Sequence, residues 1–248
     1  MLKDYPQQAG KQEIGMVLYS KHARHLVAVD CIIFGYDIHE KEIRLLLVKR
    51  SFNPAKGKWS LAGGFVEQDE SLDVAACRVL HNLTGLKNVF MKQLYSYGDI
   101  DRDPGARVIS AAYWALIKIK DIDYKLSKSS GANWQSMTKL PDLIFDHQKM
   151  VERALSELRM QVKIKPVGFE LLPEKFTLVQ LLDLYEAIYQ KNIDKRNFRK
   201  KILSMNILEK LDEKEKETSK KGAYYFRFIR ERYRKLVQNG FYFNLDVN

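Results

Sequence analysis

The chain has 248 residues, a length that suits one large domain or two ordinary ones. Apolar residues make up 46% of it, as in a globular protein, and it holds no apolar run of the roughly 18 residues that a membrane span needs. The start, MLKDYPQQAGKQEIG, is polar and lacks the apolar segment of a secretory signal. Because Cys31 and Cys77 both stand in apolar surroundings, we expect a cytoplasmic protein rather than a disulfide framework.

Positive charge is concentrated toward the C-terminus. The formal net charge is +11. From residue 161 onward, 19 Lys and Arg stand against 12 Asp and Glu, a net +7, whereas the first 160 residues have 23 against 19, a net +4. A basic C-terminal third favours a polyanion partner, most simply nucleic acid, although an ordinary lysine-rich surface has the same composition.

Two strands are predicted after an N-terminal arm. Residues 1–25 show no clear periodicity and are interpreted as this arm. Residues 26–37 form a near-continuous apolar run, which predicts a strand buried on both faces, and residues 43–50 predict a second strand. Lys49 and Arg50 end the second strand, where they either bind an anion or face solvent.

A glycine-bearing loop and a helix follow. Gly63 and Gly64 allow a ligand to approach the backbone closely. Trp59 and Phe65 offer flat apolar surfaces for a sugar or a base, with core packing as the safer interpretation for Trp59. Residues 71–83 are predicted to be helical, with capping oxygens at residues 69–71 and Gly85 as the C-cap.

The stretch from residue 57 to residue 86 resembles a Nudix box, the signature of a family that hydrolyses nucleoside diphosphates linked to another moiety. The family pattern is G-x5-E-x7-R-E-U-x-E-E-x-G-U, with U an aliphatic residue. Gly64, Glu70, Arg78 and Gly85 match it without a gap. The resemblance implies a loop followed by a helix, with Glu70 and Arg78 bracing one against the other.

The three glutamates that follow the arginine in the family pattern are absent. Their positions hold Val79, Asn82 and Leu83. In the family such glutamates converge on Mg²⁺, which requires oxygen ligands, and two aliphatic side chains with one neutral amide do not supply them. We therefore predict a protein that is not an enzyme and has no metal and no cofactor. The alternative is that acidic residues elsewhere replace the missing ligands.

A charged turn is predicted between two further strands, at YGDIDRDPGAR. Mixed acids and arginines beside a cleft suit hydroxyl-rich or phosphorylated ligands, but a solvated hairpin tip has the same residues. A short strand and a long amphipathic helix from about Asp146 follow, and His147 is interpreted as a surface residue or a residue at the N-terminus of that helix. The candidate effector-binding residues are Lys49, Arg50, Trp59, Phe65, Asp99, Asp101, Arg102, Asp103 and Arg107.

The last third of the chain predicts a winged helix-turn-helix. Thr177 and Gln180 form a capping box at the start of one helix, and Asp194 caps a second, basic helix. Residues 207–213 and 223–228 predict two strands of a hairpin, whose charged loop is the wing. A solvated helix face is the alternative for the basic residues. The candidate DNA-binding residues are Lys195, Arg196, Asn197, Arg199, Lys200, Lys220, Lys221 and Tyr224.

The predicted fold class is an α/β Nudix-like domain, with a mixed sheet between helices, over residues 26–162, followed by a winged helix domain over residues 163–248. Between residues 26 and 228 this order resembles the Nudix-related transcriptional regulators of bacteria, and most closely their arabinose-responsive members from Bacteroides-type bacteria. Other members of the group sense ADP-ribose.

The resemblance implies a homodimeric regulator that binds operator DNA and a small effector such as L-arabinose. The alternative function is a Nudix hydrolase, an ADP-ribose or nucleoside diphosphate pyrophosphatase with an accessory nucleic-acid-binding domain. A third possibility is a non-enzymatic RNA or nucleotide binder.

Overall fold

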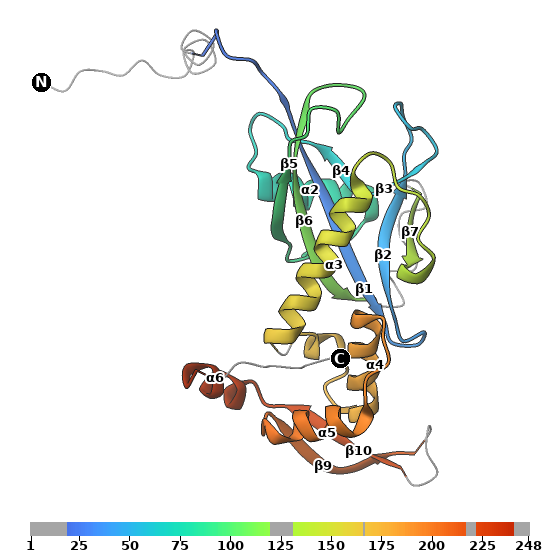
Figure 1. Cartoon of the computed structure of the whole chain (residues 1–248), viewed down its shortest axis with the longest axis vertical. Coiled ribbons are helices and arrows are strands. Elements are labelled where there is room, and N and C mark those ends of the chain that lie inside the picture. Colours follow the sequence, from blue (N-terminus) through green and yellow to red (C-terminus); the bar gives the residue numbers. More distant parts are fainter. Residues whose placement is uncertain (1–18, 120–130, 166, 217–221, 241–248) are drawn as a thin grey trace, which may run out of the picture.

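The structure is a computed structural model that describes residues 19–119, 131–165, 167–216 and 222–240. A larger sheet-and-helix part is followed by a smaller C-terminal part, with helix α3 running between them (Figure 1). Lys220, Lys221 and most of the predicted N-terminal arm lie outside the described residues. Within the described ranges, no helix combines the length and the apolarity needed to cross a membrane.

The larger part is built on one mixed sheet. Its central strand β1 pairs in parallel with β6 and antiparallel with β2 and β4, in the strand order β3-β2-β1-β6-β5, and β7 pairs with β2. The strands are β1 (Leu26–Asp37), β2 (Glu42–Lys49), β3 (Trp59–Ser60), β4 (Ala62–Phe65), β5 (Lys92–Tyr97), β6 (Val108–Lys118) and β7 (Ala132–Ser136).

Strand β1 is buried from residue 28 to residue 37, which confirms the prediction of a strand covered on both faces. Successive side chains of a strand point to opposite faces. Val29, Cys31 and Ile33 accordingly pack with the apolar stripe of α2 (Leu72–Thr84). Ile32 and Phe34 pack on the opposite side, with α3 (His147–Ile164). The sheet therefore lies between two helices.

The smaller part is a winged helix, as predicted. Its sheet order is β8-β10-β9. Its elements are the short 3-10 helix η4 (Phe169–Leu171), β8 (Phe176–Thr177), α4 (Leu178–Tyr189), α5 (Lys195–Ser204), β9 (Leu208–Glu215), β10 (Ala223–Phe228) and α6 (Arg230–Gln238). The sequence did not predict β8 or α6: a two-residue strand leaves no periodic signal, and the basic segment that forms α6 has no structure assigned from the sequence.

The helix starts follow the predicted caps. The Thr177 hydroxyl accepts from the Gln180 backbone N–H at 3.2 Å, and the Gln180 side chain accepts from the Thr177 N–H at 2.8 Å. Such reciprocal bonds satisfy two helix-terminal donors and begin α4 at a defined residue. Asp194 accepts from the Asn197 N–H at 2.7 Å and begins α5 in the same way.

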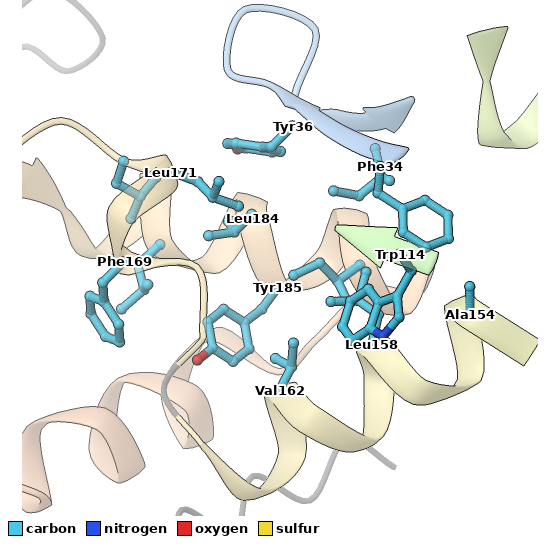
Figure 2. Close-up of a cluster of buried hydrophobic side chains, with 14 of the residues drawn as sticks. Phe34, Tyr36, Trp114, Ala154, Leu158, Val162, Phe169, Leu171, Leu184 and Tyr185 are labelled. Atoms are coloured by element: carbon cyan, nitrogen blue, oxygen red, sulfur yellow. The ribbon is translucent and has the colours of Figure 1, made fainter. Parts of the chain in front are cut away.

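One continuous hydrophobic core joins the two parts. Figure 2 shows side chains of the sheet, α3 and the winged helix in the same cluster, among them Phe34, Trp114, Leu158 and Tyr185. An ion pair between Lys41 Nζ and Asp183 Oδ2, 3.0 Å apart, also links the β1–β2 turn to α4. Domains of one chain move relative to each other unless the interface between them is large and hydrophobic. Because these two parts share a hydrophobic core, we expect the winged helix to follow the position of α3.

Candidate functional site

A pocket of about 450 Å³ lies where β2, β4 and the hairpin before β6 come together beside the start of α3. Its buried ionisable residues are Asp30, Arg102 and His147, which are 6%, 7% and 4% exposed as whole residues. Toward solvent it is lined by the aromatic residues Phe52, Phe65 and Phe145 and by the cations Lys49 and Arg50. A polar floor under aromatic walls is typical of a small-molecule site.

Arg102 holds the floor together. Its Nε and Nη2 donate to the two carboxylate oxygens of Asp146, at 2.9 and 2.8 Å, and its Nη2 lies 3.5 Å from Asp30 Oδ2. The Ser110 hydroxyl donates to the same Asp30 oxygen at 2.6 Å. Such bidentate pairing fixes both groups, and the two carboxylates raise the pKa of the Arg102 guanidinium against the cost of burial.

His147, the first residue of α3, also belongs to the floor. The backbone N–H of Leu61 donates to its Nδ1 at 3.1 Å, and its Nε2 lies 3.6 Å from Asp30 Oδ1. Burial lowers the pKa of this imidazole, so it is neutral at pH 7. The interpretation of His147 as a surface residue is wrong, since the loop preceding β4 covers it, whereas its place at the N-terminus of the helix is confirmed.

Glu70 and Arg78 brace the exposed wall of the pocket, as the family resemblance implies. Arg78 Nε donates to Glu70 Oε2 at 2.8 Å, and Arg78 Nη2 donates to the Phe65 carbonyl at 2.9 Å. Glu70 Oε1 accepts from the Glu67 N–H at 2.9 Å. These contacts lower the pKa of the Glu70 carboxyl to about 2. The brace holds the backbone of Phe65 beside the pocket.

The residues that replace the three glutamates of the family pattern lie in different surroundings on α2. Val79 is buried against Gly64, where an added Cβ would lie 2.9 Å from the valine Cγ2. Leu83 lines the pocket, and Asn82 is exposed on α2. Over the described ranges, no three His, Cys, Asp or Glu side chains are grouped to hold a metal ion. The helix that carries metal ligands in the family therefore presents apolar surface here.

The pocket gathers some of the candidate effector residues and not others. Those that line it are Lys49, Arg50, Phe65, Arg102 and Asp103. Those outside its lining are Trp59, Asp99, Asp101 and Arg107. Trp59 packs on the core, with Lys49 Nζ 5.2 Å from its ring centroid. Arg107 Nη1 donates to the carbonyls of Gly98 and Asp99, which stabilises the hairpin.

Asp30, Phe52, Phe145 and His147 are among the pocket residues that the sequence did not indicate. An acid in the middle of the apolar run of β1 was a usable signal for Asp30, because an unpaired buried carboxylate is costly. Nothing local to Phe145 or His147 indicates a site, since His147 meets its partner Leu61 from 86 positions away in the chain.

The candidate DNA-binding residues of α5 share one exposed face. Phe198 and Ile202 are buried, and the polar residues between and around them are exposed, namely Lys195, Arg196, Asn197, Arg199 and Lys200. On the wing, Tyr224 is 38% exposed, and its ring lies 3.6 Å from Lys210 Nζ and 4.6 Å from Lys214 Nζ. This surface is basic and unobstructed within the described residues.

Comparison with known proteins matches both parts of the chain to family models. A model described as the NUDIX domain matches residues 24–154, and a model described as the NrtR DNA-binding winged helix domain matches residues 168–228. The crystal structure of Shewanella oneidensis NrtR complexed with a 27mer DNA has a TM-score of 0.69 at 26% identity, covering 89% of this chain and 99% of that one.

Two curated proteins are similar in sequence. The ADPR responsive transcriptional repressor NtrR of Acinetobacter baylyi is 32% identical over 218 residues, 86% of each chain. The ADP-ribose pyrophosphatase of Methanocaldococcus jannaschii is 35% identical over 135 residues, 54% of this chain and 75% of that one. The repressor matches across both domains, and the pyrophosphatase matches over about half of the chain.

Proposed function

The chain belongs to the Nudix family, in the group that joins a Nudix domain to an NrtR-type winged helix, and we propose that it is a DNA-binding transcriptional regulator controlled by a small effector. The observation that carries this proposal is the pairing of the two sites. The pocket has the volume of a small-molecule site, and helix α2 beside it carries no cluster of acids. One hydrophobic core joins this part to the winged helix, where the outer face of α5 is cationic.

The basic face of α5 supports recognition of duplex DNA. Arginine and asparagine near the start of a recognition helix can contact guanine and adenine edges in the major groove, and lysines can hold phosphates. Arg196 and Asn197 occupy the first turn of α5 and are exposed. A two-fold homodimer would present two such helices to half-sites about one helical turn apart, or a multiple of it.

ADP-ribose is the effector that the relatives favour, because the repressor of Acinetobacter baylyi responds to it. The pocket offers aromatic walls for a flat base and cations for a pyrophosphate, through Phe52, Arg50 and Lys49. The comparisons give no support to L-arabinose, the sugar expected from the sequence resemblance.

Loss of catalysis is part of the proposal. Val79 and Leu83 occupy two of the positions from which Nudix glutamates bind metal, and Val79 is buried against the glycine loop. The second candidate function is an ADP-ribose pyrophosphatase, favoured by the relative in Methanocaldococcus jannaschii. Release of AMP from ADP-ribose in the presence of Mg²⁺, at a rate above the protein-free control, would support this second candidate.

Helix α3 gives the effector a route to DNA. Asp146 and His147 at its start belong to the pocket floor. Near its other end, Arg159 Nε donates to the Ile188 carbonyl at 3.1 Å, and Arg159 Nη2 donates to Gln190 Oε1 at 2.8 Å, both at the end of α4. An effector can change operator affinity only by favouring one arrangement of the molecule over another, and α3 contacts both sites.

A gel-shift titration tests the proposal. The protein is titrated against the DNA upstream of its own coding sequence, with random DNA of equal length as the control, alone and with ADP-ribose or L-arabinose. Specific retardation that ADP-ribose changes is the expected result. Equal affinity for both DNAs would contradict operator recognition, and an operator affinity that ADP-ribose and L-arabinose leave unchanged would contradict effector control.

A further inference from the structure

Two polar atoms of buried pocket residues, Asp30 Oδ1 and His147 Nε2, lie 3.6 Å apart. We propose that this pair binds a single hydroxyl group of the effector, so that the sugar end of the ligand enters the floor and its anionic part stays at the mouth. The inference rests on the proposed function and names the ligand chemistry of the same pocket.

His147 Nε2 is the donor of the pair. The Leu61 N–H donates to Nδ1, which therefore carries no proton of its own. A neutral imidazole has one N–H, so the proton is on Nε2. Since Nε2 reaches Asp30 Oδ1 only at 3.6 Å, beyond hydrogen-bond distance, this N–H is free for a ligand.

Asp30 Oδ1 is the acceptor. The Ser110 hydroxyl and Arg102 Nη2 both approach the other carboxylate oxygen, Oδ2, at 2.6 and 3.5 Å. Within the described part of the chain, no hydrogen bond is donated to Oδ1. The Asp30 side chain is 8% exposed and lines the pocket, so Oδ1 is held in place and still lacks a donor.

A hydroxyl group fits this pair because it can accept one hydrogen bond and donate another at the same oxygen. An oxygen about 2.8 Å from each atom can reach both of them across a gap of 3.6 Å. A phosphate or carboxylate oxygen has no proton to give to Asp30, and an ammonium group cannot accept from His147. The pair therefore selects a hydroxyl over an anion or a cation.

The charges in the pocket orient the ligand in the same sense. The floor holds one cation, Arg102, and two carboxylates, Asp30 and Asp146, which gives a net negative charge. On the side of the aromatic walls, Lys49 is exposed and Arg50 is half-buried over the rings of Phe52 and Phe145, and with one lining acid, Asp103, they give a net positive charge. A neutral hydroxylated ring is favoured inside, and a phosphate is favoured outside.

Gly63 keeps the carboxylate in this position. A Cβ added at Gly63 would lie 2.2 Å from Asp30 Oδ1, closer than two such atoms can approach. The glycine therefore allows the carboxylate to lie against the β4 backbone, where Oδ1 faces His147. The same glycine was interpreted from the sequence only as a place of close ligand approach.

The test compares ligands that differ in the sugar. Affinities of the full-length protein for ADP-ribose, ADP and L-arabinose are measured by calorimetry for the wild type and for His147→Asn, His147→Gln and Asp30→Asn. Asparagine can keep the acceptor for Leu61 and lacks the outer N–H, whereas glutamine can keep an outer N–H. His39→Asn, at an exposed histidine of the β1–β2 turn, is the matched control.

The expected result is that wild-type protein binds ADP-ribose about tenfold more tightly than ADP, the effect of one well-placed hydrogen-bonded group. His147→Asn and Asp30→Asn remove this preference without changing ADP affinity, and His147→Gln and His39→Asn retain it. If L-arabinose is the ligand instead, the same two variants weaken its binding.

Two other outcomes are distinguishable. If His147→Asn lowered the affinities for ADP and ADP-ribose by equal factors, with thermal stability unchanged, the hydroxyl inference would be overturned. The proposal that the pocket binds the effector would stand. A wild-type protein that binds none of the three probes would overturn the proposed effector and this inference together.

Discussion

The floor of the pocket and the outer face of α5 both depend on arginine, in opposite ways. The Arg102 side chain is 3% exposed and pairs with two carboxylates, whereas Arg196 and Arg199 are exposed, and no ion pair to them exists within the described residues. A buried arginine holds acidic groups that could not otherwise remain charged, and an exposed arginine remains available to a polyanion. Position in the fold, rather than residue type, separates a structural cation from a binding cation.

Removing the buried arginine should have the largest effect. In Arg102→Met the carboxylates of Asp30 and Asp146 lose their cation, and the free energy of unfolding should fall by about 3–5 kcal/mol. Urea denaturation measures this change. Arg107→Met in the same hairpin is the control, because Arg107 donates only to two backbone carbonyls. A loss below about 1 kcal/mol in Arg102→Met would mean that the network is dispensable.

Removing an exposed arginine should change binding and not stability. Arg196→Ala or Asn197→Ala should weaken operator binding by about 1–3 kcal/mol per lost base contact. Effector affinity and the urea midpoint should stay at wild-type values. Gel shifts with Arg24→Ala, an exposed arginine of the larger part, give the baseline. If Arg196→Ala lost effector binding and kept the operator, the division of labour between the two parts would be wrong.

The hydrogen bonds that connect α3 to α4 should affect the coupling between the two sites and not the affinity of either site. Arg159→Met removes the hydrogen bonds from α3 to the end of α4. We expect it to reduce the coupling free energy between effector and operator, which is typically about 1–3 kcal/mol, and to leave each separate affinity nearly unchanged. Arg153→Met is the matched control on α3, because Arg153 lies over the Tyr95 ring instead. Wild-type coupling in Arg159→Met would exclude this route.

The smallest expected effect is a pH dependence from His147. Burial lowers its pKa below 6.5 in the folded protein. Between that lowered pKa and 6.5 the unfolded chain binds more protons, so the free energy of unfolding should fall as the pH falls below 6.5. Urea midpoints between pH 7.5 and pH 5 measure the slope. His147→Asn should flatten it and His39→Asn should not, and equal slopes in both variants would assign it to another group.

Much of the fold was predictable because local physics specifies it. The apolar run of β1, the Gly85 C-cap of α2 and the capping box of α4 lie where they were predicted, and Ser71, one of three residues expected to offer capping oxygens, caps α2. Each depends on residues within a few positions of one another. The strand order β3-β2-β1-β6-β5 could not be predicted in this way, because strand pairing depends on contacts between residues far apart in the chain.

The candidate site was predictable only in part. Lys49, Phe65 and Arg102 were predicted near a ligand and do line the pocket. Arg102 was expected to be available to an anion, but it is buried between two acids. A charged turn in the sequence does not reveal which of its side chains points inward, and that direction determines whether a cation is available.

The sequence by itself determined the order of the two domains, the loop-helix frame from Gly64 to Gly85 and the basic face of α5, because these depend on spacing along the chain. Only the tertiary structure decided what the pocket floor is made of. Asp30, Arg102 and His147 come from β1, a hairpin and the start of α3, and burial fixes which of their atoms are paired and which remain free. Pairing across such separations is a property of the packed chain, since no residue's own neighbours in sequence specify it.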